Sequence, residues 1–491
     1  MRRLTQGAAA IAMMALAACS SDRATEPQLT PTDDKAAESA VGWAVRVTNS
    51  NDDGPGSLRA AIAVVNGSTR TSVIQFDAGL APILLLSPVT YTGPQPLTLL
   101  GRGVVLDGTS TGGDVFVATG GGNLTLQDIT VQKGTRHGVL ILVPATRTGT
   151  QSLRLANAHI LDNRLHGVYM QDQVLDPALV VDQAPNAFDS PASLQVTVVG
   201  GSVLRNGLAP GRSDFDGIRI NEGGAGDLRF SISGTVVKFN GADGIETDER
   251  GTGSVIASAS STTFDQNGPN DPLDPDDGWD IDEAGEGDIN ATVSGSTFNG
   301  NFDEGLDVTE LDGGSILASV TDVVANGNTD EGVKFTESAG GDLTVNLTRV
   351  TNNDTVEEEG IQVEELGEGN VVVTFTDVTA LRNGASHPSA EIKENIDIRE
   401  RDGGNLTATW LRVAANASAN DDGAVIDERG AGNLSASITS SEFRNNALQS
   451  LELRESDAGT GAATLTSVIR TGNLVSDAVR NTGGVTITIV P

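Results

Sequence analysis

The sequence predicts an all-β fold, a parallel β-helix, from a repeated phrase, its spacing and its alternation. From about residue 217 a six-residue phrase recurs in the order glycine, aliphatic, any residue, aliphatic, any residue, glutamate. Six of the eight intervals between successive closing glutamates are 27 or 28 residues long. Each unit contains three short segments of alternating aliphatic and polar residues, which is typical of β-strands. Three strands per unit at a constant interval predict a solenoid of roughly a dozen coils.

The closing glutamates form a regular series along the chain. Because strands of consecutive coils pair about 4.8 Å apart, these side chains are expected to stack in one row, called here the glutamate ladder. A glycine stands four residues after every one of them, where it is expected to supply a positive φ at a corner. The ladder consists of Glu222, Glu249, Glu283, Glu310, Glu337, Glu365, Glu400, Glu428 and Glu455.

Two interpretations of the ladder are open. Neighbouring carboxylates at this spacing repel by about 0.9 kcal/mol in bulk water and by more near protein. Bound Ca²⁺ is one source of compensation, because hard cations take several carboxylate oxygens. In the other interpretation each glutamate accepts hydrogen bonds from amides of its own turn, and the fixed glycine favours this one. The nearby cations Lys334, Arg250, Arg401 and Arg429 are a further source of neutralisation.

The repeat also divides the chain into regions. It is clearest over residues 217–460, and weaker copies upstream assign residues 111–491 to the coils. Two longer intervals predict loops near 267–277 and 383–394. Residues 43–110 are assigned to an N-terminal cap and the first coils, with Ser57 expected to begin a helix over 58–66. Residues 485–490 are expected to form the last strand.

The first residues have the features of an export signal. Arg2 and Arg3 precede an apolar run over 8–18 that is too short to span a bilayer as a helix. The motif LAAC, ending at Cys19, resembles the lipobox of bacterial lipoproteins, and this resemblance implies cleavage before Cys19 and its lipidation. An ordinary signal peptide with a chance cysteine is the alternative.

These features predict how the protein is anchored. Residues 1–18 are assigned to a signal peptide, and residues 19–42 to the lipidated Cys19 and a flexible polar tether. The membrane is therefore an expected partner, through the N-terminal lipid. Ser20 follows the cysteine, which in the lipoprotein sorting rule favours the outer membrane, so the expected location is the outer membrane or the cell surface.

A longer phrase at the start of the predicted cap resembles a known family. Residues 45–66, VRVTNSNDDGPGSLRAAIAVVN, closely resemble the N-terminal cap of bacterial surface proteins of the right-handed parallel β-helix repeat family. The segment IQF…ILLL…LTLLGRGVVLDG that follows is similar to the first coils of that family. The resemblance covers nearly all of the mature chain and implies a right-handed β-helix in a surface lipoprotein.

Composition excludes some partners. The chain has 31 Lys and Arg against 66 Asp and Glu, a net charge of −35. Nucleic acid is excluded as a partner, since a phosphate backbone requires a basic surface. Cys19 is the only cysteine, so the fold has no intrachain disulfide and depends on its core. A monomer is expected.

A second row of polar residues immediately precedes the repeat glycines. It is acidic from Asp216 to Asp422 and begins upstream with His137 and His166. Two stacked histidines can bind a metal or share a proton. The favoured alternative is that both are exposed turn residues.

The densest acidic stretch covers residues 271–288. It supplies the candidate calcium ligands, although its spacing matches neither the EF-hand nor the nonapeptide calcium repeat. Trp279 lies inside the stretch and, by alternation, is expected to point into the core. The candidate ligands are Asp276, Asp277, Asp280, Asp282 and Glu283.

The sequence therefore leaves two functional hypotheses. The main one is a lipid-anchored surface protein with a structural or binding role, a spacer or an adhesin, that takes a glycan or a surface protein as its ligand. The alternative is a calcium-assisted carbohydrate-active enzyme, either a polysaccharide lyase or a glycoside hydrolase. No catalytic residue is assigned, because no recognised catalytic set is visible. An enzyme needs a local departure from the repeat, whereas a spacer needs only repetition.

Overall fold

The computed structural model describes residues 43–172, 189–211, 214–270, 276–385 and 393–491. They belong to one compact unit that begins at Gly42. The predicted signal peptide, Cys19 and the tether lie outside the described residues, as do residues 271–275 and 386–392 of the two predicted loops. The described residues of both loops contain no strand.

Each coil contributes one strand to a first sheet, whose fourteen strands pair in parallel with one another. Its strands are β4 (Val89–Tyr91), β6 (Phe116–Ala118), β8 (Val139–Leu142), β11 (Val168–Gln171), β14 (Ile218–Glu222), β17 (Ile245–Glu249), β20 (Trp279–Glu283), β22 (Leu306–Glu310), β25 (Val333–Glu337), β28 (Ile361–Glu365), β31 (Ile396–Glu400), β34 (Ala424–Gly430), β37 (Glu452–Asp457) and β40 (Arg480–Thr482).

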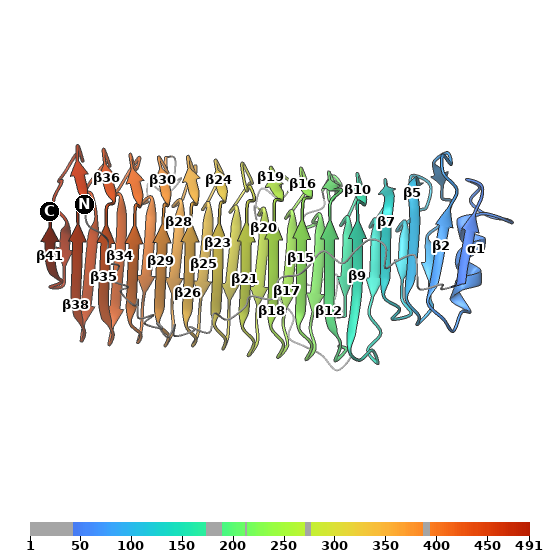
Figure 1. Cartoon of the computed structure of the whole chain (residues 1–491), viewed down its shortest axis with the longest axis horizontal. Coiled ribbons are helices and arrows are strands. Elements are labelled where there is room, and N and C mark those ends of the chain that lie inside the picture. Colours follow the sequence, from blue (N-terminus) through green and yellow to red (C-terminus); the bar gives the residue numbers. More distant parts are fainter. Residues whose placement is uncertain (1–42, 173–188, 212–213, 271–275, 386–392) are drawn as a thin grey trace, which may run out of the picture. The chain divides into compact units, whose positions relative to one another are not determined.

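A second strand follows in each coil, and these strands also lie side by side in Figure 1. They are β1 (Trp43–Val47), β2 (Ser72–Phe76), β5 (Leu97–Asp107), β7 (Leu124–Gln132), β9 (Thr150–Ala156), β12 (Ser193–Val199), β15 (Leu228–Ser233), β18 (Val255–Ser260), β21 (Ile289–Ser294), β23 (Ile316–Thr321), β26 (Leu343–Thr348), β29 (Val371–Thr376), β32 (Leu406–Leu411), β35 (Asn433–Thr439), β38 (Thr460–Thr466) and β41 (Thr486–Val490).

A third, short strand in most coils pairs with its counterpart in the next coil, and in one coil the single residue Thr297 takes this place and bridges to Thr263 and Val324. In the first coils the long strands β5 and β7 also supply the third position. The short strands are β3 (Ile83–Leu84), β10 (His159–Leu161), β13 (Ser202–Leu204), β16 (Val236–Lys238), β19 (Thr263–Asp265), β24 (Val324–Asn326), β27 (Thr351–Asn353), β30 (Thr379–Leu381), β33 (Ala414–Asn416), β36 (Glu442–Arg444) and β39 (Ile469–Thr471).

Alternation along these strands builds one continuous core. In β20 the first and third residues, Trp279 and Ile281, are fully buried, and Asp280 points outward. The ring of Trp279 stacks on Phe264 with centroids 5.6 Å apart, and Phe264 stacks on Phe298 at 4.6 Å. Equivalent residues of consecutive coils therefore contact each other through the core, as the repeat predicts.

The N-terminal end of the stack is covered by the predicted cap. Helix α1 (Leu58–Asn66) begins where expected, with the Ser57 hydroxyl accepting a hydrogen bond from the Ala60 amide. Its buried face, Leu58, Ala61, Ile62 and Val65, joins the core and packs against β1, β2 and β4. The helix shields apolar residues and strand edges that the first coil would otherwise expose.

The predicted fold class is confirmed by the parallel pairing of equivalent strands: the protein is an all-β parallel β-helix, and its described residues contain a single helix. The last strand, β41, also forms where the sequence predicts it. The regular pairing has one consequence for function. Any residue at a given position of the repeat has neighbours of the same position about 4.8 Å away in the coils on either side.

Candidate functional site

The outward face of the first sheet carries a cluster of carboxyl groups around β20, β22 and β25. In the pairing register Asp280 lies beside Asp307, and Asp307 lies beside Lys334. Carboxylate oxygens of Asp277, Asp280 and Asp307 all lie within 4.8 Å of one another. Asp277, Asp303 and Glu304 form a second such group. We call these five carboxyls, together with Lys334, the acidic site.

Only two of the five predicted calcium ligands belong to this site. Asp277 and Asp280 come together, whereas Asp282 occupies a different outward column, beside Asp248 and Thr309. Glu283 is fully buried, and its Oε1 accepts a hydrogen bond from the Gly287 amide of its own turn at 3.3 Å. Because Asp282 and Glu283 lie apart from Asp277 and Asp280, the five residues do not form one ligand set.

The sequence prediction of calcium ligands omitted the members contributed by the next coil, although Glu304 was expected in the second acidic row. Asp303, Glu304 and Asp307 lie about one repeat after the predicted acidic stretch, and only the stacking register brings them to it. The signal was present, because Asp307 follows Asp280 by 27 residues. Local density of acidic residues does not reveal these neighbours, whereas residues at equal positions of the repeat do.

The pKa values of the carboxyls in the acidic site are shifted in different directions. Burial, reinforced by the charges of Glu304 and Asp330, raises the pKa of Asp303 to about 10. Burial also raises the pKa of Asp277 and of Asp280 well above the usual range, and neighbouring carboxylates add to it. For Glu304, burial acts in the same direction, but the charge and hydrogen bond of Lys334 outweigh it and lower the pKa.

Lys334 is the cation of this site. Its ammonium donates a hydrogen bond to Glu304 and lies 3.1 Å from Oδ2 of Asp307. Burial alone would lower the pKa of Lys334, but Asp307, Glu304 and Glu331 raise it, so the side chain stays protonated. One positive charge among five carboxyls leaves the acidic site with room for a further cation or for several protons.

A second polar cluster lies upstream on the same face. The Arg219 guanidinium contacts Asp214, Glu246 and Asp248, with the Asp248 oxygen 3.3 Å from Nη2. The Asp216 amide donates a hydrogen bond of 2.9 Å to Nδ1 of His166. Burial raises the pKa of Asp216 to about 6, although Arg219 opposes the shift.

The two predicted turn histidines are part of that cluster and are buried. His137 and His166 are each 4% exposed, so the interpretation of exposed turn residues is wrong. The physical reason is the register: β8, β11 and β14 stack His137, His166 and Asp216 in one column, and Tyr169 covers both rings. The acidic part of this column is equally buried, for example at Glu331 and Glu359.

The glutamate ladder lies on the inward side of the first sheet. Seven of its nine members end their strands, Glu428 and Glu455 lie two residues before the ends of β34 and β37, and all are at most 4% exposed. Eight of the nine accept a hydrogen bond from an amide two or four residues later, for example Glu400 from Gly404 at 2.7 Å and Glu310 from Asp312 at 3.0 Å. These contacts are those of the own-turn interpretation.

The cations proposed to neutralise the ladder bind elsewhere. Arg401 donates to Glu364 at 2.7 Å, Arg429 pairs with Asp427, and Lys334 serves the acidic site. Arg250 lies 3.2 Å from Asp248. The carboxyl partners of the three arginines each directly precede a ladder glutamate, and alternation directs them away from the core.

The glycine four residues after each ladder glutamate is required for close approach. At Gly341 a Cβ would lie 1.5 Å from the carbonyl oxygen of Gly314, the same glycine one coil earlier. A Cβ at Gly404 would likewise lie 1.4 Å from the carbonyl oxygen of Gly369. None of these glycines has a positive φ, so the expectation that they supply one is wrong. Consecutive turns simply stack with no room for a side chain.

The ladder begins one coil earlier than the sequence pattern shows. Asp172 follows Gln171, which pairs with Asn221, so Asp172 stands beside Glu222. It is 2% exposed, and its oxygens accept hydrogen bonds from the Ser190 hydroxyl at 2.7 Å and the Gly223 amide at 2.9 Å. The repeated phrase ends in glutamate, so it does not identify Asp172 as a member of the ladder.

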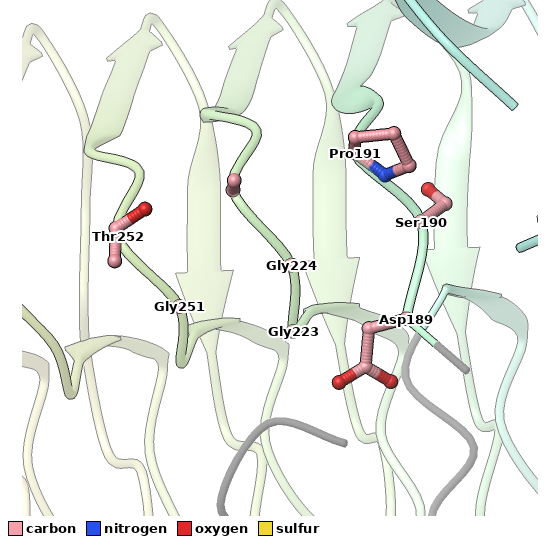
Figure 2. Close-up of a pocket in the computed structure, with 8 residues that line it drawn as sticks. Asp189, Ser190, Pro191, Gly223, Gly224, Gly251 and Thr252 are labelled. Atoms are coloured by element: carbon pink, nitrogen blue, oxygen red, sulfur yellow. The ribbon is translucent and has the colours of Figure 1, made fainter. Parts of the chain in front are cut away.

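A hollow of about 350 Å³ lies over the turns at this end of the ladder (Figure 2). Its lining consists of Asp189, Ser190, Pro191, Gly223, Gly224, Ala225, Gly251 and Thr252. A second hollow of about 300 Å³ lies near His159 and Arg102. The first lining contains no aromatic side chain and one carboxyl group, so the acidic site offers the richer chemistry.

Comparisons with known proteins agree with the fold. No protein-family model matches the chain, and no curated relative matches it. Among solved structures, pectate lyase Pel9A is 15% identical with a TM-score of 0.36, over 72% of this chain and 84% of that chain. The periplasmic alginate epimerase AlgG is 11% identical with a TM-score of 0.31, over 83% and 79%.

A third similar structure is the A-module of the Azotobacter vinelandii mannuronan C-5 epimerase AlgE4. It is 12% identical with a TM-score of 0.29, over 90% of this chain and 94% of that chain. At these scores the likenesses carry no argument about activity, and the fold class rests on the strand pairing. Among the described residues, no helix combines the length and the apolar character needed to cross a bilayer.

Proposed function

We propose that the protein is a calcium-assisted carbohydrate-active enzyme, a polysaccharide lyase or glycoside hydrolase, that works at the acidic site. The observation that supports this proposal is the pair Asp303 and Glu304, adjacent carboxyls whose pKa values move in opposite directions. The next coil repeats the pair as Asp330 and Glu331, but there both pKa values are raised. The acidic site is thus a local departure from the repeat.

The pair supplies the two protonation states that glycosidic bond cleavage needs. Asp303 is protonated at neutral pH and half-buried on the outward face, so it is suited to donate a proton to a leaving oxygen. Glu304 is ionised and held by Lys334, so it is suited to accept a proton or to act as a nucleophile. Groups with pKa values pushed apart by their surroundings are the usual acid and base of such enzymes.

The donor set of the acidic site fits calcium. Asp277, Asp280 and Asp307 offer oxygen ligands within 4.8 Å of one another, and Ca²⁺ prefers several carboxylate oxygens. A bound calcium ion supplies positive charge that holds a carboxylate or hydroxyl of a sugar. The carboxyls of these three residues would hold it in their ionised form, and its binding would release the protons that burial favours on Asp277 and Asp280. Lys334 remains with Glu304.

The stacked geometry suits a linear polymer. Further carboxyls of Glu331, Glu358 and Glu359 continue the row beyond the acidic site, coil after coil. A chain lying along the stack would contact equivalent positions about every 4.8 Å. A net charge of −35 disfavours polyanions unless a cation bridges them. The similar solved structures include a pectate lyase, two alginate-type epimerases and an α-1,3-glucanase.

The test is turnover of a panel of acidic and neutral polysaccharides, with calcium and then with chelator. We expect new reducing ends or unsaturated products that disappear with chelator. Asp303→Asn and Glu304→Gln should each lower the rate at least about 100-fold. Asp322→Asn, which removes an exposed ion pair with Arg349, is the matched control and should keep the rate. Equal rates for Glu304→Gln and the control would contradict the assignment.

A second proposal concerns display of the protein. We propose a lipid-anchored surface protein whose β-helix serves as a spacer or adhesin, supported by the LAAC motif and the even glutamate ladder. Metabolic labelling with a palmitate analogue tests the anchor. Labelling should be lost on Cys19→Ala, and labelling that persists in this variant would contradict it. Absence of turnover on every polysaccharide would favour this role over the enzyme.

A further inference from the structure

The glutamate ladder is a buried row of carboxyls without cations. Register pairs join Glu310 to Glu337, Glu337 to Glu365 and Glu365 to Glu400, and the remaining members pair in the same way. No described ladder glutamate forms an ion pair. The charged or titratable groups that face each member are the carboxyls of the coils before and after it, with Asp172 at the N-terminal end.

Each carboxyl uses only part of its hydrogen-bonding capacity. In the seven members from Glu249 to Glu428 one oxygen accepts from an amide of its own turn, as at Glu365, where the Gly367 amide lies 2.7 Å from Oε1. Both oxygens of Glu222 accept from such amides, and neither oxygen of Glu455 does so among the described residues. The Oε2 atoms are buried and have no donor among the described residues at Glu249, Glu283, Glu310, Glu337, Glu365, Glu400, Glu428 and Glu455. Buried acceptors without donors are costly, and buried uncompensated charges cost more.

Ladder carboxyls of consecutive coils lie next to one another in the pairing register. Glu365 is within hydrogen-bonding reach of Glu337, and Glu428 is within reach of Glu455. Two ionised carboxylates offer acceptors only, so they repel each other. A contact of this kind becomes a hydrogen bond when one carboxyl is protonated and donates to the other.

We propose that the ladder binds protons at neutral pH, each shared between the carboxyls of two consecutive coils, and that these protons are part of the structure. The proton bridges an oxygen of one glutamate and an oxygen of the next, which removes one negative charge and gives both atoms a partner. In all members except Glu455, amides of the turn hold the other oxygen in place. The ladder then needs neither calcium nor basic side chains.

The direction of the pKa shifts agrees with this arrangement. Burial, followed by the contact with Glu337, raises the pKa of Glu365 to about 9. Burial and the contact with Glu455 raise the pKa of Glu428 to about 8. A glutamate in the unfolded chain has a pKa of about 4.3, so between that pH and the raised value the folded state binds more protons. Stability therefore falls as pH rises through this window.

The test compares the unfolding of wild type with that of Glu365→Gln between pH 7 and 10. Glutamine mimics the protonated acid in shape and supplies a donor without titrating. For wild type we expect the ratio of folded to unfolded protein to fall up to about tenfold per pH unit for each shared proton lost. Glu365→Gln should flatten this dependence and raise the unfolding midpoint at pH 9 relative to wild type.

Glu364→Gln is the matched control on the same strand. Its side chain points outward to Arg401, so the substitution should change stability without changing its dependence on pH. Infrared spectra of wild type at pH 7 provide a second measurement that needs no variant. They should contain a protonated carboxylic acid band that disappears at alkaline pH. Wild-type stability that is flat or rises from pH 7 to 10, or a spectrum without that band, would overturn the proposal.

Discussion

The imidazole rings of His137 and His166 stack with centroids 5.2 Å apart and an angle of 8° between their planes. Two cationic rings at this distance would repel each other, so the stack disfavours the doubly charged pair. Burial, with Arg219 acting in the same direction, lowers the pKa of His166 to about 3. Burial and the neighbouring ring lower that of His137 well below its usual value.

We predict that neither histidine titrates between pH 5 and 8. In the unfolded chain both take up protons near pH 6.5, so the unfolded state binds more protons below that pH and stability falls as pH decreases. NMR spectra of the imidazole nitrogens across pH 4 to 8 check this, with His159 of the third strands for comparison. A titration midpoint near 6.5 for both buried rings would contradict the structure.

A second prediction concerns the stacked turn glycines. Gly341→Ala places a Cβ 1.5 Å from the Gly314 carbonyl oxygen, so the turn must move, and we expect a loss of about 3 kcal/mol in the free energy of unfolding. The adjacent Gly340 faces open space, and Gly340→Ala should change stability by less than about 1 kcal/mol. Denaturant unfolding of both variants checks the difference. Equal effects would show that the turns do not stack as described.

A third prediction concerns the aromatic core. Phe298→Ala removes a fully buried ring that stacks on Phe264, and it should cost about 3–5 kcal/mol through lost burial and the cavity left behind. Phe302→Ala is the control, because this ring is 45% exposed and should change stability by about 0.5 kcal/mol. Thermal and denaturant unfolding measure both. A small loss for Phe298→Ala would mean that the coils do not share one core.

The fold could be predicted from the sequence because the repeat contains two independent signals. Alternation predicts strands, and the 27-residue interval predicts their stacking, so Trp279 was correctly expected in the core and helix α1 at residues 58–66. The capping serine is a local signal that needs no knowledge of tertiary structure. These features depend on neighbours in sequence or on equal positions in the repeat.

The candidate site was harder to predict, because its members come from different coils. Asp280 and Asp307 are adjacent in space only through the register, and Asp282, two residues from Asp280, points into another column. Burial also escaped prediction: nothing local to His166 indicates that Tyr169 and Phe215 cover it. Local density of acidic residues was a poor guide, whereas comparison of equal repeat positions would have found Asp307.

Calcium binding at the acidic site underlies the proposed catalysis, and isothermal titration of Ca²⁺ measures it without any substrate. Wild type and the Asp322→Asn control should bind with the same stoichiometry and affinity. Asp307→Asn removes one of the three clustered carboxylates and should weaken binding at least about tenfold. Calcium binding of unchanged affinity in Asp307→Asn, or no binding by wild type, would contradict a calcium site at Asp277, Asp280 and Asp307.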